Sequence, residues 1–447
     1  MSHVPSPSVP TTTAARAAPV PDAAVASAAV TTDAELAHRA RRRTVRLVDA
    51  NGRALAGAAV RVEQTGHAIA FGCIGFDETE RAWRRLAGRT PAPGEDALLD
   101  RLDALWFDLF DTATLPFYWG TFEPERGRMR TAALRAAAEH YVSRGARVKG
   151  HPLVWHTVAP RWLEPLPDDE VLRLLRERVR RDAGEFAGLV DTWDAINEVV
   201  IMPVFDKDTN AITRVAATQG RVPMVQLAFD EARAANPAAT LLLNDFDMSA
   251  DYEHLVEECL AAGVRIDALG LQSHMHKGAW GRDKTLDVLE RFGRFGLPLH
   301  FTETTILSGD LMPRDIVDLN DHRVERWPST PDGLDRQAED VVAHYRALVA
   351  DPRVQAVTYW GLSDHGMWLH APGGLVTVDG EPKPAYDALR ELVRGSWWLP
   401  PTTVTADADG RVQVHGLPGR YVVEVAGGRH DVVVEDGDDA ETLVTVR

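Results

Sequence analysis

Short apolar segments alternate with longer amphipathic segments along most of this chain, and this alternation constrains the fold more than any other feature. Eight segments have the composition of strands buried on both faces, and they lie at 68–76, 112–119, 146–155, 189–197, 240–246, 267–275, 298–304 and 356–362. Amphipathic helical segments lie at 168–187, 224–237, 251–264, 283–296 and 333–352. Such strands are typical of a parallel sheet that helices cover. Eight units favour an α/β fold, a closed (β/α)₈ TIM barrel, over an open doubly wound sheet.

Polar side chains follow six of the predicted strands, at the ends where a barrel of this type carries its active site. In strand order they are His151, Trp155 and His156; Asn197 and Glu198; Asn244 and Asp245; Gln272, Ser273 and His274; Glu303; and Trp360. One such residue alone is typical of a helix cap or a loop. A series over six strands indicates a functional site.

Two of these residues, Glu198 and Glu303, are carboxylates that should face one another across the barrel mouth. Paired carboxylates beside aromatic side chains suit glycoside hydrolysis. One acid must be protonated to release the leaving oxygen, and the other must be ionised to attack the anomeric carbon. Their proximity raises one pKa, because ionising both is costly. The rings of Trp155, Trp360 and Trp368 either stack on sugar faces or pack in the core.

Six segments resemble glycoside hydrolase family 10, the retaining β-xylanases, in their order and spacing. They are KGHPLVWH (149–156), WDAINE (193–198), LLLNDF (241–246), GLQSHM (270–275), HFTET (300–304) and TYWGLSD (358–364). The resemblance covers roughly 68–395 and implies an endo-β-1,4-xylanase-like enzyme with a carbohydrate substrate, no cofactor and no metal. It implies that Glu198 is the general acid/base and Glu303 the nucleophile.

The resemblance also implies which side chains surround the sugar at the cleavage point. Asn197 would bind the 2-hydroxyl, His151 and Trp155 would line the subsite, Gln272 and His274 would hold the nucleophile, and Trp360 and Trp368 would form an aromatic wall.

The chain departs from the family after the second predicted strand. Family members usually carry E-N-E-M-K-W there, which supplies Glu, Asn and Lys to the next sugar. Here TLPFYW (114–119) places Thr114, Leu115 and Tyr118 at those positions, and Thr304-Thr305 replaces the usual acid after the nucleophile. We therefore expect Tyr118 to line a rewritten pocket. Short β-xylosides, or glycosides with a bulky apolar aglycone, should be better substrates than polymeric xylan. The alternative is hydrolysis of a plant-metabolite glycoside, as in the tomatinases of this family.

Other classes of protein stay open at this point. A catalytically inactive sugar-binding barrel would keep the aromatic residues but usually lose a carboxylate. A metal-dependent hydrolase would need a converging set, for which His151, His156, His274 and His276 are candidates. No dinucleotide or P-loop motif follows a strand. The formal charge of −17 argues against nucleic acid and anionic membranes as partners.

The sequence patterns at the two ends of the chain predict a second unit beside a barrel of residues 67–400. Residues 44–66 indicate two strands around the turn DANG, and 402–447 continue with period-two alternation and Gly-rich turns. We expect these ends to build one accessory β-sandwich. A structural role is favoured over that of a carbohydrate-binding module, because these segments contain no row of Trp or Tyr residues beyond Tyr421.

Residues 1–35 are rich in Pro, Ala, Thr and Val and contain no aromatic residue, which predicts a disordered leader. The prolines interrupt any apolar run of the length that a secretory signal needs. This favours a cytoplasmic location, with secretion open if a signal lies upstream. Only Cys73 and Cys259 are present, so the sequence predicts no disulfide framework.

Overall fold

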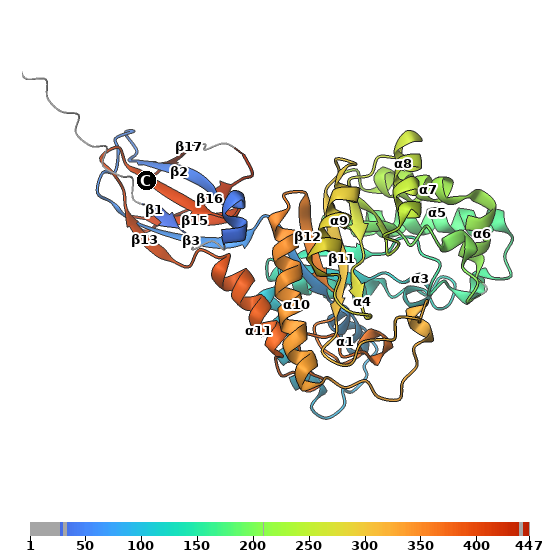
Figure 1. Cartoon of the computed structure of the whole chain (residues 1–447). Coiled ribbons are helices and arrows are strands. Elements are labelled where there is room, and N and C mark those ends of the chain that lie inside the picture. The colour runs from blue at the N-terminus through green and yellow to red at the C-terminus, as the bar shows by residue number, and fades with distance from the viewer. Residues whose placement is uncertain (1–26, 30–33, 209, 438–440, 447) are drawn as a thin grey trace, which may run out of the picture.

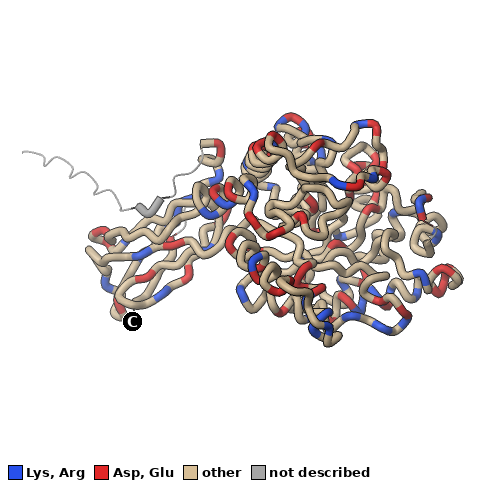
Figure 2. The backbone as a smooth tube through the Cα atoms, turned by 90° about the horizontal axis from the view of Figure 1, so that it is seen from below, with Lys and Arg blue, Asp and Glu red and all other residues tan. Residues whose placement is uncertain are grey.

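The computed structural model describes residues 27–29, 34–208, 210–437 and 441–446. Figure 1 shows two units, a barrel covered by helices and a smaller unit of β-strands beside it. Acidic and basic residues are interspersed along both (Figure 2). In the part of the chain that the structure describes, no helix combines the length and the apolar character that a membrane span requires.

The larger unit is a closed barrel of eight parallel strands, as predicted. In chain order these are β4 (Ala70–Ile74), β5 (Thr112–Pro116), β6 (Arg147–His151), β7 (Thr192–Asn197), β8 (Thr240–Asp245), β9 (Ala268–Leu271), β11 (Leu299–Ile306) and β12 (Val354–Tyr359). Each strand pairs with the next, and the pairing of β12 with β4 closes the ring. A two-residue strand, β10 (His274–Met275), extends the sheet at the carboxyl end of β11.

Helices surround the barrel (Figure 1). They are α1 (Phe76–Leu86), α2 (Glu95–Leu109), α4 (Thr131–Ser143), α5 (Asp168–Glu185), α6 (Ala211–Gln219), α7 (Arg221–Ala235), α8 (Ala250–Ala261), α9 (Gly281–Gly293), α10 (Pro331–Ala350) and α11 (Pro384–Arg390). Shorter turns are α3 (Trp119–Phe122), η2 (Arg161–Leu163), η3 (Met202–Val204), η4 (Leu319–Asp321), η5 (Trp368–His370) and η6 (Glu391–Ser396). Gly75 alone separates β4 from α1 and is the N-cap of that helix. A Cβ there would lie 2.7 Å from the Tyr141 ring.

Strand β7 contains a β-bulge that sets the directions of two polar side chains at the active site. Asp194 pairs with Leu242 and Ile196 with Leu243, so Ala195 is an extra residue in the ladder. A regular strand sends residues three apart to opposite faces, whereas a bulge re-aims them. Asp194 and Asn197 consequently both reach polar partners, His151 on β6 and Asn244 on β8.

The smaller unit consists of two four-stranded sheets that share one apolar core. One sheet has the order β1 (Ser27–Ala29), β14 (Arg411–Gly416), β2 (Arg41–Val48), β17 (Glu441–Thr445), and the other β13 (Thr402–Thr405), β3 (Ala59–His67), β15 (Gly419–Val425), β16 (Gly428–Val434). The interpretation of β2 and β3 as two strands around one turn needs correction. The turn after β2 exists, with Asp49 accepting from Asn51, but the two strands belong to different sheets.

The predicted leader, 1–35, falls mostly outside the described residues. Of its described part, Ser27–Ala29 forms β1, which pairs in parallel with β14. Residues 34 and 35 begin η1 (Ala34–Arg39). The described part of this stretch therefore has regular structure, contrary to the expectation of disorder.

Candidate active site

The carboxyl ends of the barrel strands gather the predicted site residues at one mouth. Asn197 ends β7 and Glu198 follows it, Glu303 lies in β11, and His151 ends β6. The others follow the strand ends: Tyr118 after β5, Trp155 after β6, Gln272 after β9, and Trp360 after β12. His274 begins β10, and Trp368 begins η5. Glu198 has a φ of 57°, so the backbone turns sharply into a strained conformation where the strand stops.

A continuous chain of side-chain amides links the two carboxylates. Asn244 Nδ2 donates to Glu303 Oε1 at 3.0 Å and to Asn197 Oδ1 at 2.7 Å. Gln272 Nε2 donates to the same Asn197 Oδ1 at 3.1 Å and to Glu198 Oε1 at 3.2 Å. The positions of the acids are thus fixed relative to one another. The sequence placed Asn244 at a strand end but gave no signal of this role.

Glu198 has the environment of a protonated acid. Burial is the main cause that raises its pKa to about 8, and the negative charge of Glu303 adds to the shift. The indole of Trp155 donates to Glu198 Oε2 at 2.8 Å, which opposes the shift only in part. Glu198 therefore holds a proton at neutral pH.

Glu303 lies among nitrogen atoms that suit an anion. Besides Asn244, its Oε2 lies 3.2 Å from His274 Nε2, and its Oε1 lies 4.0 Å from His151 Nε2. His274 Nδ1 lies 3.0 Å from the Thr305 hydroxyl, so a neutral residue holds this ring where the resemblance expects an acid. The nucleophile candidate is therefore supported from two sides of the barrel.

A buried charged group fixes the His151 ring. Asp194 lies 2.6 Å from His151 Nδ1 and 2.8 Å from Lys149 Nζ. Burial opposes ionisation of Asp194, but the charge of Lys149 and the hydrogen bond with His151 hold its pKa below the usual value. Asp194 therefore stays ionised and orients His151 towards Glu303.

Aromatic rings enclose the carboxylates. Tyr118 lies 5.7 Å from His151 and 5.4 Å from Trp155, between ring centroids. Phe76 stands edge-on to Tyr118 at 5.8 Å and to Trp360 at 5.7 Å. Burial, with the charges of the two glutamates, raises the pKa of Tyr118 well above its usual value, so the phenol keeps its proton. The sequence did not single out Phe76, which belongs to this wall.

Trp368 completes the wall on the other side of the nucleophile. Its ring lies 5.1 Å from His274, and Trp360 lies 6.3 Å from the same ring. Both tryptophans therefore lie next to the histidine that contacts Glu303.

Tyr118 brings a replaced position to this site, and Leu115 does not. Leu115 is fully buried in the apolar core, where it packs near Gly75. The expectation that Leu115 changes the pocket is therefore corrected, because β5 turns this side chain into the core. Thr114, the neighbouring residue of β5, is buried and its hydroxyl has no partner among the described residues.

The other histidines proposed as metal candidates lie in apolar or aromatic surroundings. Burial lowers the pKa of His156 to about 4 and that of His276 to about 3. His156 packs on Phe205, and His276 on Trp368. Among the described residues, no three His, Cys, Asp or Glu side chains converge as metal ligands.

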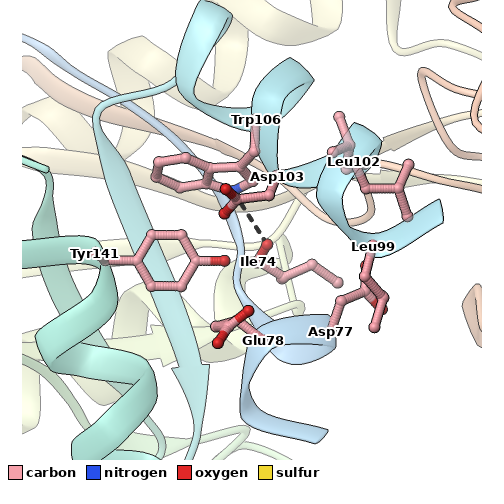
Figure 3. A pocket seen from close by; sticks show the side chains of 9 residues that line it. Ile74, Asp77, Glu78, Leu99, Leu102, Asp103, Trp106 and Tyr141 are labelled. Atoms are coloured by element: carbon pink, nitrogen blue, oxygen red, sulfur yellow. Dashed lines mark hydrogen bonds between the residues drawn. The ribbon is translucent and has the colours of Figure 1, made fainter. Parts of the chain in front are cut away.

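A separate cavity lies between α1, α2 and α4, and Figure 3 shows it from close by. It has a volume of about 20 Å³ and is lined by Ile74, Asp77, Glu78, Leu99, Leu102, Asp103, Trp106, Tyr141 and Leu362. This is room for roughly one water molecule, not for a sugar ring. None of the residues that hold the carboxylate pair lines it.

Comparison with known proteins identifies the family. A family model described as Glycosyl hydrolase family 10 matches residues 113–392, which is more than half of the chain. The chain belongs to glycoside hydrolase family 10. It is a retaining glycoside hydrolase of the xylanase type, and the comparisons do not favour the alternatives of an inactive sugar-binding barrel or a tomatinase-like enzyme.

Relatives of this family 10 enzyme match over much of their own length. Endo-1,4-beta-xylanase B of Thermotoga neapolitana is 28% identical over 291 residues, covering 62% of this chain and 78% of the relative. Endo-1,4-beta-xylanase 3 of Hypocrea jecorina is 26% identical over 280 residues, covering 61% and 71%. The solved xylanase 10B from Thermotoga petrophila RKU-1, in complex with xylobiose, shares the fold with a TM-score of 0.58 and 23% identity, over 73% of this chain and 94% of that one.

Proposed function

We propose that this enzyme hydrolyses β-xylosidic bonds by double displacement, with Glu303 as the nucleophile and Glu198 as the general acid and then the general base. The observation that carries the proposal is the contrast between the two carboxyls. Glu198 has a pKa raised to about 8, while Glu303 lies among the nitrogens of Asn244, His274 and His151. A retaining mechanism needs this division between a protonated acid and an ionised nucleophile.

In the first displacement, a Glu303 oxygen forms a bond to the anomeric carbon while the bond from that carbon to the leaving oxygen breaks. Glu198 gives its proton to the leaving oxygen. In the second, ionised Glu198 takes a proton from water, the water oxygen bonds to the anomeric carbon, and Glu303 is released. The side chains of Trp155 and Gln272 each bind one oxygen of Glu198, so the carboxyl is held for both transfers.

Asn197 supports binding of the sugar at the cleavage point. Its Oδ1 accepts from both Asn244 and Gln272, which fixes the orientation of the amide. Its Nδ2 is buried and has no partner among the described residues. A buried donor without a partner costs free energy, so a hydroxyl of the bound sugar would supply the missing acceptor.

The relatives indicate the class of substrate, and Tyr118 bears on its length. The matched relatives are named endo-1,4-beta-xylanases, and the solved xylanase 10B was crystallised with xylobiose. Tyr118, where the family usually has Lys, brings a protonated phenol against the sugar subsite instead of a cation. Hydrogen bonds at buried positions discriminate strongly, so this change favours short β-xylosides over polymeric xylan.

The test is the stereochemistry of the first-formed product. Proton NMR during hydrolysis of an aryl β-xyloside should show β-xylose before mutarotation produces the α-anomer. An initial α-product would contradict the assignment of Glu303 as a nucleophile. No turnover of any aryl or oligomeric β-xyloside would contradict the substrate class.

A further inference from the structure

The connection between β11 and α10 carries a short segment, Asp318–Asp321, that touches two opposite sides of the barrel mouth. We name it the strap. Asp318 stabilises it internally, because Asp318 Oδ1 accepts from the backbone N of Asn320 at 2.9 Å and from Asn320 Nδ2 at 3.0 Å. This fixes the Asn320 amide and leaves its Oδ1 available as an acceptor.

The first anchor of the strap lies on the aromatic wall. Trp368 Nε1 donates to Asn320 Oδ1 at 3.2 Å. The Trp368 ring is 5.1 Å from His274, which lies 3.2 Å from Glu303. The strap is therefore separated from the nucleophile by two side chains.

The second anchor lies on the loop that follows Glu198. Lys207 Nζ lies 3.1 Å and 3.0 Å from the two carboxylate oxygens of Asp321, and 3.7 Å from Asp318. Phe205, on the same loop, packs on His156 after β6 at 4.5 Å between ring centroids. This anchor is thus tied to the opposite rim of the mouth.

The order of the strands shows what the two anchors span. Around the ring, β12 is followed by β4, β5, β6 and β7, so the strands that precede Trp368 and Lys207 are diametrically opposed. The strap contacts residues of both connections, so it joins loops that leave opposite sides of the mouth. Glu198 and Glu303 belong to the same mouth.

We infer that the strap roofs the substrate cleft, so that glycosides enter by a chain end and a polymer cannot lie across the catalytic pair. The inference rests on the proposed function and adds a reason for short substrates that is independent of Tyr118. Both anchors are exposed polar contacts, and Lys207 and Asp321 have side chains 49% and 57% exposed. Salt and point mutations should therefore loosen the strap without disturbing the core.

The experiment compares kcat/KM on soluble xylan with kcat/KM on an aryl β-xyloside. Wild-type enzyme should prefer the aryl substrate. Replacing residues 317–323 by Gly-Ser-Gly should raise the xylan-to-aryl ratio about tenfold or more, since a steric barrier acts on the long substrate alone. Lys207→Ala should raise it about threefold, as expected for one exposed ion pair. Lys207→Arg keeps the pair and should leave the ratio unchanged.

Arg411→Ala breaks an ion pair with Glu441 in the smaller unit. It is the control for surface mutations away from the mouth. An unchanged ratio in both the strap replacement and Lys207→Ala would overturn the inference. An equal fall on both substrates would also overturn it, because the strap would then bind substrate. If the strap replacement fails to fold, the comparison of Lys207→Ala with Lys207→Arg decides.

Limited trypsin digestion separates this inference from the proposed function. Lys207→Ala should speed cleavage after Arg323 relative to Lys207→Arg, whatever the enzyme hydrolyses. No difference in cleavage would count against the strap. Absence of aryl xyloside turnover in the wild type would count against the proposed function alone.

Discussion

Replacing Glu198 by Gln should stabilise the folded protein at alkaline pH, even though it removes the proposed acid. In the fold, burial and then the charge of Glu303 raise the pKa of Glu198 from 4.5 to about 8. Between these values the unfolded chain has lost the proton and the folded chain still holds it. The stability of the wild type therefore falls as pH rises through this window.

The pKa difference gives the magnitude. One pKa unit corresponds to about 1.4 kcal/mol, so the raised pKa costs the folded wild type about 5 kcal/mol above pH 8. Below pH 4.5 both states are protonated and the cost is absent. Gln cannot ionise, so Glu198→Gln should gain on the wild type by about 1.4 kcal/mol per pH unit between pH 5 and pH 8.

Urea unfolding of both proteins at each pH from 5 to 9 measures this gain. The quantity to follow is the unfolding free energy of the variant minus that of the wild type, plotted against pH. The new amide can shift this difference by a constant amount, but a constant shift does not change the slope. Glu177→Gln, at an exposed glutamate paired with Arg173 on α5, is the matched control and should show a flat difference. A difference that does not change with pH for Glu198→Gln would refute the account of its ionisation.

Three further predictions follow from the site. Glu303→Ala should abolish turnover of every substrate, whereas Glu198→Ala should keep the glycosylation step of dinitrophenyl glycosides, whose leaving group needs no proton; equal losses on good and poor leaving groups would contradict these roles. The wild-type kcat/KM should fall as pH rises through about 8, where Glu198 loses its proton. Trp155→Phe should move this fall to higher pH, because the hydrogen bond from Trp155 lowers the pKa of Glu198. A move to lower pH would be inconsistent with this. Asn244→Ala should lower kcat about 100-fold by releasing the nucleophile from its geometry, while Asn236→Ala, at another buried asparagine, should leave kcat unchanged.

The barrel was predictable because its strands are buried on both faces. Their apolar runs stand out against the polar helices in composition alone. Helices α1, α2, α4, α6 and α11 were not predicted. Helix α1 in particular is rich in Arg and acidic residues, and its apolar positions are few. Strand ends were placed too late at β5 and β6, since residues such as Trp119 and Trp155 continue the aromatic character beyond the last paired residue.

Pairing between distant segments was not predictable from local pattern. Strands β2 and β3 are close in sequence and alternate as a hairpin would, yet β2 pairs with β14 and β17, and β3 with β13 and β15. The partners come from the far end of the chain. Period-two alternation specifies which face is buried, not which strand lies alongside.

The candidate site was predictable where residue type and strand position coincide, as at Glu198, Glu303 and Asn197. The role of Asn244 depends on the β-bulge in β7, which brings Asn197 into its reach and has no signature in the sequence. The strap depends on Lys207 and Asp321, an exposed ion pair between two separate loops. Contacts of this kind follow from the fold and become visible only in it.

The central claim is that Glu303 forms the covalent bond to the sugar, and active-site trapping tests it most directly. Incubation with a dinitrophenyl 2-deoxy-2-fluoro-β-xyloside slows release of the intermediate more than its formation. Digestion and mass spectrometry should then locate one fluoroxylosyl group on the peptide that contains Glu303, and Glu303→Gln should remain unlabelled. A label on Glu198 or any other residue, or rapid turnover of the reagent with no labelled peptide at any time, would contradict the account.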